Sequence, residues 1–372
     1  MIEFGRSKSY AHINWGIYSH MNWEIFITGL VISCLAALLL SSTASQWGLI
    51  DRPSGRKQHA SATPMVGGIA VFAGLLSIAF TNLPVFTEFA LIISLALLML
   101  VLGILDDAHS LTSGYRLFVQ LLAGLTVYIF GDLQFNELGH LWFLDTPLET
   151  GIFALPLTLI AIVGGINAIN WMDGLDGLVG GMLTSTLIFI AILAWLSNSM
   201  MTYNFSLVVI AALIGFLLFN YRFPWNKKAR IFMGDAGAYP LAFIIVALFL
   251  KTSQPPETIL PPVLALWRIA IPLFDMTRVI WLRLRLGKLP LSDDRLHIHH
   301  LLVDGGRPHR QVVNILCSIN FLIGLVGVAL HMSGVNEGWL FVILLLFLVL
   351  YYKFSSRFAH SLDLKVQARL VE

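Results

Sequence analysis

Four polar residues recur at every third position near the end of one apolar segment: Asn167, Asn170, Asp173 and Asp176. On a straight α-helix each step of three residues falls about 60° short of a full turn, so the first and the last would face opposite ways. The four side chains can converge only if the helix tightens or ends near Gly174 and Gly177, because glycine accepts unusual backbone angles. This spacing favours the mouth of a pocket over a packing stripe.

Carboxylates also mark two other breaks between apolar runs. Asp106 and Asp107 directly follow the apolar residues 102–105. Adjacent carboxylates at a membrane boundary repel each other and resist burial, so we expect a metal ion or a cationic partner near them. Asp235 begins a later apolar run within a glycine-rich stretch, where a helix N-terminus favours anions. Taken singly, each of these features is also explained by a solvated helix terminus.

Cationic and imidazole side chains gather in two further hydrophilic stretches. One holds Arg56, Lys57 and His59, and the other holds Arg283, Arg295, His297, His299 and His300. Phosphate or sugar binding suits the second stretch better than a transition-metal site does. Positive-inside topology or attraction to anionic lipid is the competing explanation for both. Oxygen ligands that suit Mg²⁺ or Mn²⁺, combined with cationic loops, indicate phosphoryl transfer.

The composition identifies the surroundings of this chemistry. Hydrophobic residues make up 57% of the 372 residues, charged residues make up 12%, and the mean hydropathy is +0.81. A soluble domain would carry about a quarter charged residues. We therefore expect an all-α, polytopic membrane protein with one lipidic substrate. No cationic tract indicates nucleic acid, and Cys34 and Cys317 lie in apolar runs that imply no disulfide framework.

Eleven apolar runs approach the roughly 20 residues that cross a ~30 Å hydrocarbon core. The ninth is unusual because it contains Arg268 and Asp275, which we expect to pair on one helix face. A transporter would also carry ionisable groups at mid-bilayer, and it is the competing class of function. The expected spans are 24–41, 66–83, 87–105, 116–131, 152–170, 177–197, 204–221, 236–250, 259–282, 311–331 and 338–353.

Lysine and arginine are distributed unequally between the loops. Nineteen of the 23 fall in alternate loops, in the C-terminal tail or near the span ends that border them, whereas the other loops between spans hold only Lys251. The positive-inside rule then places the N-terminus outside and the C-terminus in the cytoplasm. Residues 21–372 are expected to form one multi-span domain, after a leader, 1–20, of doubtful status with Met21 as an alternative start. The expected cytoplasmic loops are 42–65, 106–115, 170–176, 222–235 and 283–310.

These motifs, in this order, resemble the polyprenyl-phosphate N-acetylhexosamine-1-phosphate transferases of glycosyltransferase family 4. The histidine-rich sequence resembles the WecA-type branch of that family. Two features depart from the family pattern, because Ser110 stands where a third Asp is frequent and Ala236 and Ala238 replace hydroxyl residues. The resemblance covers Arg56-Lys57-x-His59 with Pro64 and Gly67-Gly68, Leu105-Asp106-Asp107, Asn167 through Gly177, Gly234-Asp235-x-Gly237 and His297-Ile298-His299-His300.

The resemblance implies a reaction at the cytoplasmic leaflet of the bacterial inner membrane. N-acetylglucosamine 1-phosphate passes from UDP-GlcNAc to undecaprenyl phosphate, and UMP is released. The expected cofactor is Mg²⁺, with Mn²⁺ as a substitute, and the expected use is a surface polysaccharide such as O-antigen. Another UDP-N-acetylhexosamine is the alternative donor, and a homodimer is left open.

The resemblance also assigns roles to residues. The role of the Asp106–Asp107 pair stays open between general base, positioning of the lipid phosphate, and covalent nucleophile. The implied roles are catalysis for Asp106, Asp107, Asp173 and Asp176, metal binding for Asp235 and Asn170, and substrate binding for Lys57, His59, Asn167, Arg283, Arg295, His297, His299 and His300.

Overall fold

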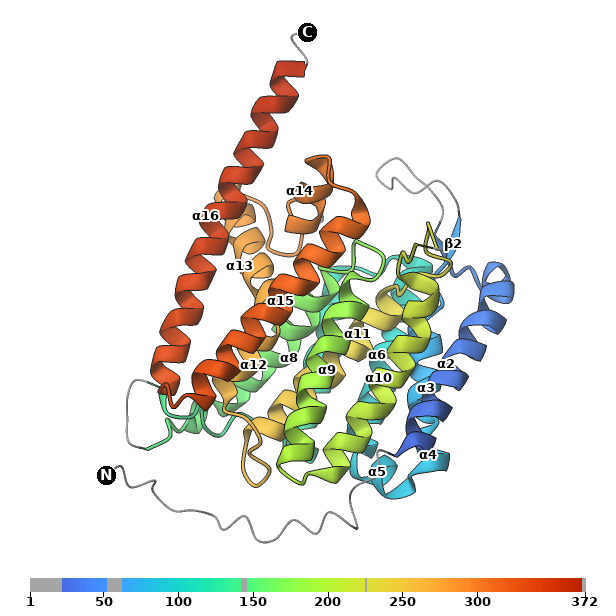
Figure 1. Ribbon diagram of the computed structural model, residues 1–372, viewed down its shortest axis with the longest axis vertical. Coiled ribbons are helices and arrows are strands. Elements are labelled where there is room, and N and C mark those ends of the chain that lie inside the picture. The colour runs from blue at the N-terminus through green and yellow to red at the C-terminus, as the bar shows by residue number, and fades with distance from the viewer. Residues whose placement is uncertain (1–21, 52–61, 142–145, 225, 293, 370–372) are drawn as a thin grey trace.

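The computed structural model describes residues 22–51, 62–141, 146–224, 226–292 and 294–369. Figure 1 shows these residues as a bundle of long helices whose ends gather at two opposite faces. The one sheet in the described ranges is an antiparallel pair of two-residue strands, β1 (Ile50–Asp51) and β2 (Thr63–Pro64). Nine helices in these ranges are long and apolar enough to cross a bilayer. The expected all-α, polytopic membrane fold is confirmed.

The helices fall into two groups by length. The long ones are α2 (Trp23–Thr43), α6 (Ala90–His109), α7 (Ser113–Phe130), α8 (Ala154–Asn170), α9 (Leu178–Leu196), α10 (Met200–Asn220), α11 (Asp235–Ser253), α15 (His309–Met332) and α16 (Glu337–Arg369). The shorter ones are η1 (Ala44–Trp47), α3 (Gly67–Leu76), α4 (Ile78–Thr81), α5 (Leu83–Glu88), η3 (Gly151–Phe153), α12 (Pro262–Arg268), α13 (Ala270–Arg285) and α14 (Ile298–Asp304).

Helix α11 lies at the centre of the bundle, with every residue from Ala236 to Leu250 buried. Its first turn packs backbone to backbone against α3 and α6. A Cβ atom on Gly68 would collide with the backbone of Gly237, and one on Gly103 with the carbonyl of Asp235. Lipid is as apolar as leucine, so helices in a membrane associate through such close contacts between small residues. The glycines therefore fix the position at which α11 begins.

The outer helices show the reverse pattern, with apolar side chains on the surface. Leu39 of α2, Phe130 of α7 and Leu350 of α16 are all exposed. Water would penalise such faces, whereas hydrocarbon does not. This pattern agrees with a bundle that is surrounded by lipid.

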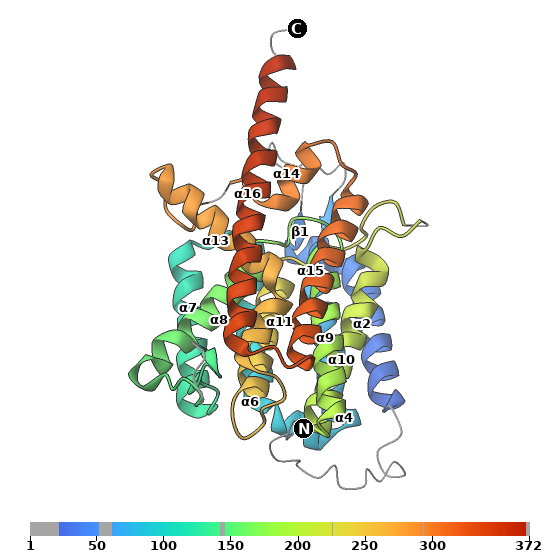
Figure 2. The same cartoon turned by 60° about the vertical axis from the view of Figure 1, so that its left-hand side comes forward.

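Two of the eleven expected spans are interrupted helices. The span expected at 66–83 is divided into α3 and α4, and the span at 259–282 is divided into α12 and α13. Pro272 has no N–H, so it cannot donate to the carbonyl of Arg268. Asn320 of α15 bridges this break: its Nδ2 donates to the Arg268 carbonyl at 3.0 Å, and its Oδ1 accepts from the N–H of Ile271 at 3.2 Å. Beyond the break, α13 projects sideways from the bundle (Figure 2).

The expected pairing of Arg268 with Asp275 is wrong. Arg268 donates to the carbonyl of Ser185 at 2.9 Å and lies 4.6 Å from the ring centroid of Phe189. Asp275 instead pairs with Arg278 at 3.2 Å. The helix break at Ile269 changes the rotational phase between the two residues, so a continuous-helix argument does not apply to them.

Candidate active site

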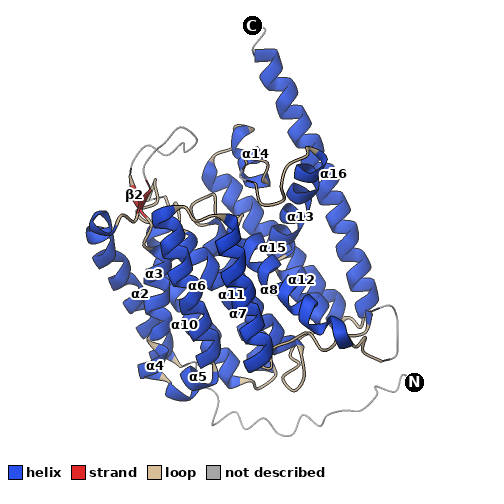
Figure 3. Ribbon diagram, turned by 180° about the vertical axis from the view of Figure 1, so that it is seen from behind, coloured by secondary structure: helices blue, strands red, loops and turns tan. Residues whose placement is uncertain are grey.

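A cavity of about 720 Å³ lies at one end of the bundle. Figures 1 and 3 show β2 and α14 at that end. Its wall takes residues from all five loops expected to carry the chemistry. Lys57 and His59 lie outside the described residues, and Asp106 is not part of the wall. The expected residues that the structure brings together here are Asp107, Asn167, Asn170, Asp173, Asp176, Asp235, Arg283, Arg295, His297, His299 and His300.

The end of α8 explains how residues at every third position reach one cavity. The helix stops at Asn170, and the chain turns before α9 begins at Leu178. Gly177 adopts a φ of +83°, which glycine tolerates without strain, and its N–H donates to the Oδ1 of Asn220 at 2.6 Å. The expected helix end near the two glycines is confirmed.

The Asp107 carboxylate lies against the N-terminus of α11. Its two oxygens accept from the N–H groups of Asp235 and Ala236, each at 3.0 Å. Gly234 makes this approach available, because it has a φ of +68° and a Cβ atom there would lie 2.5 Å from the Asp107 Oδ2. Unpaired N–H groups at a helix start favour a negative charge, so α11 holds Asp107 in the cavity wall.

The Asp106 side chain is not part of the cavity wall and is only 5% exposed. Its carboxylate accepts from the hydroxyl of Tyr239 at 2.7 Å and from the N–H of Leu111 at 2.8 Å. Arg116 of α7 supplies the expected cationic partner, at 3.3 Å. These contacts tie α6, α7 and α11 together directly behind Asp107.

Asn170 and Asp235 form a close polar pair in the cavity wall. The Asn170 Nδ2 donates to the Asp235 Oδ1 at 2.6 Å. Turning the amide over would place its oxygen beside the carboxylate, which gives the oxygen ligands that Mg²⁺ prefers. No group of three His, Cys, Asp or Glu side chains within the described ranges could hold a metal by itself. The pair therefore fits an ion that completes its shell with water and substrate phosphate, as Mg²⁺ commonly does, and does not fit a closed protein cage.

Two carboxylates follow on the turn after α8. Loss of hydration, together with the nearby charges of Asp107 and Asp176, raises the pKa of Asp173 from 3.8 to about 7. Asp176 pairs with Arg222, whose Nε lies 2.6 Å from the Asp176 Oδ2. The cavity therefore concentrates negative charge near Asp107 and Asp173 that a cation would relieve.

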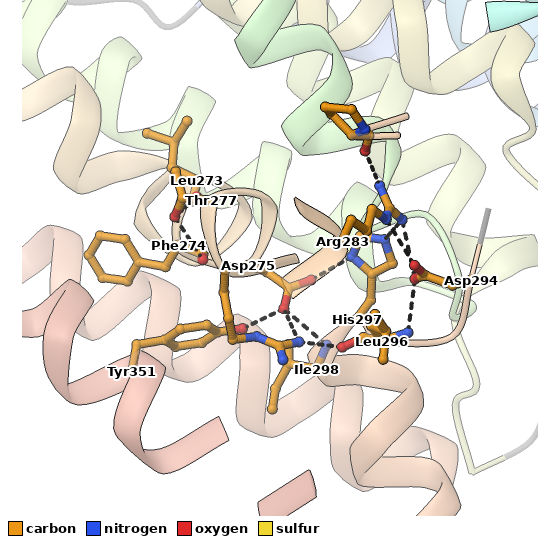
Figure 4. Close-up of polar contacts among 12 residues, drawn as sticks. Leu273, Phe274, Asp275, Thr277, Arg283, Asp294, Leu296, His297, Ile298 and Tyr351 are labelled. Atoms are coloured by element: carbon orange, nitrogen blue, oxygen red, sulfur yellow. Dashed lines mark hydrogen bonds and ion pairs between the residues drawn. The ribbon is translucent and has the colours of Figure 1, made fainter. Parts of the chain in front are cut away.

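Arg283 is the best-anchored cation of the site and is almost fully buried. Its Nε and Nη2 donate to the two carboxylate oxygens of Asp294, at 2.8 and 3.2 Å (Figure 4). Its Nη1 donates to the carbonyl of Pro290 at 2.6 Å, and its guanidinium lies 4.7 Å from the ring centroid of Trp171. This bidentate pair holds Arg283 rigidly beside the cavity. Burial raises the pKa of Asp294, but the Arg283 hydrogen bond outweighs it, and the net pKa is lowered.

The histidine-rich motif begins α14 and stacks its rings along the wall. The ring of His299 lies 4.1 Å from that of His300 and 5.8 Å from that of His297. Burial, and then the neighbouring imidazoles of the motif, lower the pKa of His299 well below 6.5. Burial and then the charge of Arg295 lower the pKa of His300 to about 4. Both rings are therefore neutral at pH 7. Arg295, at the edge of the motif, pairs with Asp304 at 2.9 Å.

The structure adds residues that the sequence interpretation missed. Arg116 and Arg222 belong to the nineteen cations on which the orientation rests, and Asp275 belongs to the expected pair with Arg268. A carboxylate within an apolar span was the signal for Asp275, since such groups seldom lack a role. The added residues that line the cavity or hold its wall are Arg116, Gln120, Trp171, Arg222, Asp275 and Asp294.

Comparisons with known proteins show the family of the chain. The model for glycosyl transferase family 4 matches residues 89–253. The undecaprenyl-phosphate alpha-N-acetylglucosaminyl 1-phosphate transferase of Escherichia coli (strain K12) is 33% identical over 313 residues, covering 84% of each chain. The Yersinia pestis enzyme of the same name is 35% identical over 311 residues, 83% of this chain and 84% of the relative. The Salmonella typhi enzyme of the same name is 32% identical over 317 residues, which cover 85% of each chain. The chain therefore belongs to glycosyl transferase family 4, as its motifs predict.

Proposed function

We propose that the protein transfers N-acetylglucosamine 1-phosphate from UDP-GlcNAc to undecaprenyl phosphate. The products are undecaprenyl-diphospho-GlcNAc and UMP. The observation that carries the proposal is the single cavity in which the carboxylates of three helix ends face the cations and imidazoles of the 283–300 loop. The names of the relatives support the same reaction.

The reaction is a phosphoryl transfer with one bond formed and one broken. An oxygen of the lipid phosphate bonds to the β-phosphorus of UDP-GlcNAc, and the bond from that phosphorus to the bridging oxygen breaks. The electron pair leaves with UMP. A phosphate monoester has a second pKa near ~6, so the nucleophile is already largely ionised at neutral pH. The protein must therefore mainly position the reactants and balance charge.

The cavity wall offers groups for both tasks. Asp107 faces the cavity, so of the adjacent carboxylates it is the one placed to assist the attack, while Asp106 holds the wall behind it. Arg116 lies in the wall beside them and supplies positive charge for the lipid phosphate. Arg283, Arg295 and the neutral imidazoles of His299 and His300 supply donors for the diphosphate and the sugar.

A bound Mg²⁺, or Mn²⁺ in its place, would neutralise charge on the phosphates of the substrate. Asp235 and Asn170 are the residues that would hold it. Their hydrogen-bonded pairing in the cavity wall, and the carboxylate charge that raises the pKa of Asp173, support this assignment.

We place the enzyme in the bacterial inner membrane with its cavity facing the cytoplasm, and its product in a surface-polysaccharide pathway such as O-antigen synthesis. The excess of cations at the loops on the cavity side supports the orientation. The cytosolic supply of nucleotide sugars is consistent with it.

The test uses purified protein, undecaprenyl phosphate and a panel of UDP-sugars, with UMP release as the readout. UDP-GlcNAc is expected to give the highest kcat/KM. A higher value for another UDP-N-acetylhexosamine would favour the alternative donor. Uptake of radiolabelled sugar into vesicles, without incorporation into lipid, would favour a transporter and contradict the proposal.

A further inference from the structure

A buried hydrogen-bond network lies directly behind the histidine-rich motif, outside the cavity wall. Its centre is Asp275 of α13, a side chain that is only 1% exposed. The Asp275 Oδ2 lies 2.7 Å from the Nδ1 of His297. The Oδ1 accepts from the N–H of Ile298 at 3.0 Å, the hydroxyl of Tyr351 at 2.8 Å and the Nη2 of Arg278 at 3.2 Å. Figure 4 shows His297, Ile298 and Tyr351 converging on this carboxylate.

The network determines which nitrogen of His297 carries the hydrogen. A carboxylate that receives several donors acts only as an acceptor, so the Nδ1 of His297 must donate to it. The other nitrogen, Nε2, lies on the side of Arg283, 3.5 Å from its Nη2. Trp171 meets the same ring edge-on, with 5.7 Å between centroids. The ring is therefore held in one orientation, with Nε2 next to the anchored guanidinium.

Three separate segments meet at this carboxylate. Asp275 belongs to α13, His297 and Ile298 to the start of α14, and Tyr351 to α16. Arg278 also donates to the carbonyl of Leu296, just before the motif. The loop that carries the imidazoles is thus attached to two helices through a single side chain.

We infer that Asp275 is a positioning residue for His297, with Tyr351 as the residue that orients the Asp275 carboxylate in turn. By fixing the tautomer and the rotation of the imidazole, Asp275 leaves Nε2 as an acceptor facing the Arg283 Nη2 at 3.5 Å, so His297 helps to aim that guanidinium at an anionic group in the cavity. The group is the diphosphate of the nucleotide sugar, so this inference rests on the proposed function. Carboxylates that orient metal-ligating histidines in this way contribute about 10- to 100-fold to metal affinity or activity, and we expect an effect of the same order here.

The test is a double-mutant cycle with UMP release as the readout. Asp275→Asn keeps the size of the side chain, but its amide Nδ2 cannot accept from the Nδ1–H of His297. We expect Asp275→Asn to lower kcat by about 10- to 100-fold in the wild-type background. The KM for UDP-GlcNAc should change by less than about threefold, since Arg283 and Arg295 remain. In a His297→Gln background the same substitution should cost less than about twofold, because residues that act through one another are non-additive.

An equal loss in both backgrounds would overturn the inference, since Asp275 would then act independently of His297. A normal kcat for Asp275→Asn in a folded protein would overturn the inference as well. Asp275→Asn leaves Arg278 buried beside a neutral group, so its thermal unfolding is measured against the wild type. If Asp275→Asn unfolds, Tyr351→Phe is measured in its place, because it removes one donor to Asp275. We expect Tyr351→Phe to lower kcat in the wild-type background and to have no further effect on kcat in the His297→Gln background.

Tyr352→Phe is the matched control, because it removes a hydroxyl at the next position of α16 and should leave kcat unchanged. Failure of the proposed function gives a different result from failure of this inference. An inactive wild-type protein with UDP-GlcNAc and undecaprenyl phosphate would contradict the function. An active wild-type protein with additive losses would contradict only the role of Asp275.

Discussion

The Asp107 carboxylate caps the helix whose first residue is Asp235, accepting from the Asp235 N–H at 3.0 Å. The two residues are 128 positions apart in the sequence, yet this hydrogen bond fixes the Asp107 carboxylate against the first turn of α11. A change at Asp107 therefore alters its own charge and also the first turn of α11. Phenotypes at these two positions must be read together.

Asp235→Asn should lower kcat by about three orders of magnitude, as when a charge-neutralising group is lost from a transition state. Chelation with EDTA should abolish the activity of the wild type, and Mg²⁺ or Mn²⁺ should restore it. UMP release in chelated and reconstituted samples is the measurement. Full turnover in the presence of the chelator would remove the metal from the proposed mechanism.

Asp106→Asn and Asp107→Asn should both be strongly impaired, but for different reasons. Asp107 faces the cavity, so its substitution should lower kcat, and the loss of one of its two contacts with the α11 N-terminus should lower the unfolding temperature by less than the Asp106 change does. Asp106 accepts from Tyr239, Leu111 and Arg116, so its substitution should also lower the unfolding temperature. Kinetics and thermal unfolding of the two purified variants separate these effects. Equal unfolding temperatures would contradict the division of roles.

Direct attack by the lipid phosphate predicts that UMP appears only when undecaprenyl phosphate is present. An obligate covalent route through Asp107 would instead release UMP from enzyme and UDP-GlcNAc alone. A single-turnover assay without lipid acceptor distinguishes the two routes. Stoichiometric release of UMP in that assay would rule out direct attack.

The pKa of Asp173 predicts a pH dependence of stability in the absence of metal. Its pKa is about 7 in the folded protein and 3.8 ordinarily, so between these values the folded state binds more protons than the unfolded chain. The stability should therefore fall as the pH rises through this window. Thermal unfolding in EDTA from pH 4 to 8 should show a shallower fall for Asp173→Asn. Glu149→Gln, an exposed change at the other end of the bundle, should retain the wild-type slope. Identical slopes for all three proteins would disprove the prediction.

Gly174→Ala should damage the site by displacing His299. A Cβ atom at position 174 would collide with the Nε2 of that ring, which His297 and His300 hold from either side. A displacement near 1 Å at a site can cost about 100-fold in rate, so a loss of that order in kcat/KM is expected. Gly164→Ala, whose nearest neighbour would lie 4.0 Å away, is the control and should be nearly neutral.

Orientation in the membrane can be measured with single-cysteine reporters. Glu149 lies before the start of α8, and Arg295 lines the cavity at the opposite end of that helix. Both residues are exposed. An impermeant thiol reagent should label Glu149→Cys in intact cells and Arg295→Cys only after permeabilisation. Labelling of position 295 in intact cells would reverse the proposed orientation.

The sequence by itself determined the class of fold and most of the site. Apolar runs of span length require helices whose backbone groups are satisfied internally, so the all-α membrane fold follows from hydropathy. The spacing of Asn167, Asn170, Asp173 and Asp176 required a helix end, and α8 does end there. Motifs in alternate loops must share one face, and eleven of the expected residues do line one cavity.

Only the tertiary structure decided how neighbouring residues divide their tasks. Asp106 and Asp107 are adjacent in the chain, but α11 draws one into the cavity wall and Tyr239 holds the other behind it. Arg268 and Asp275 occur in one apolar run, but Pro272 interrupts the helix between them, and Asp275 reaches His297 instead. Periodicity in the sequence describes the faces of a single helix and does not describe how two helices pack against each other. Which side of a residue meets a cavity depends on contacts between distant helices, and those contacts exist only after packing.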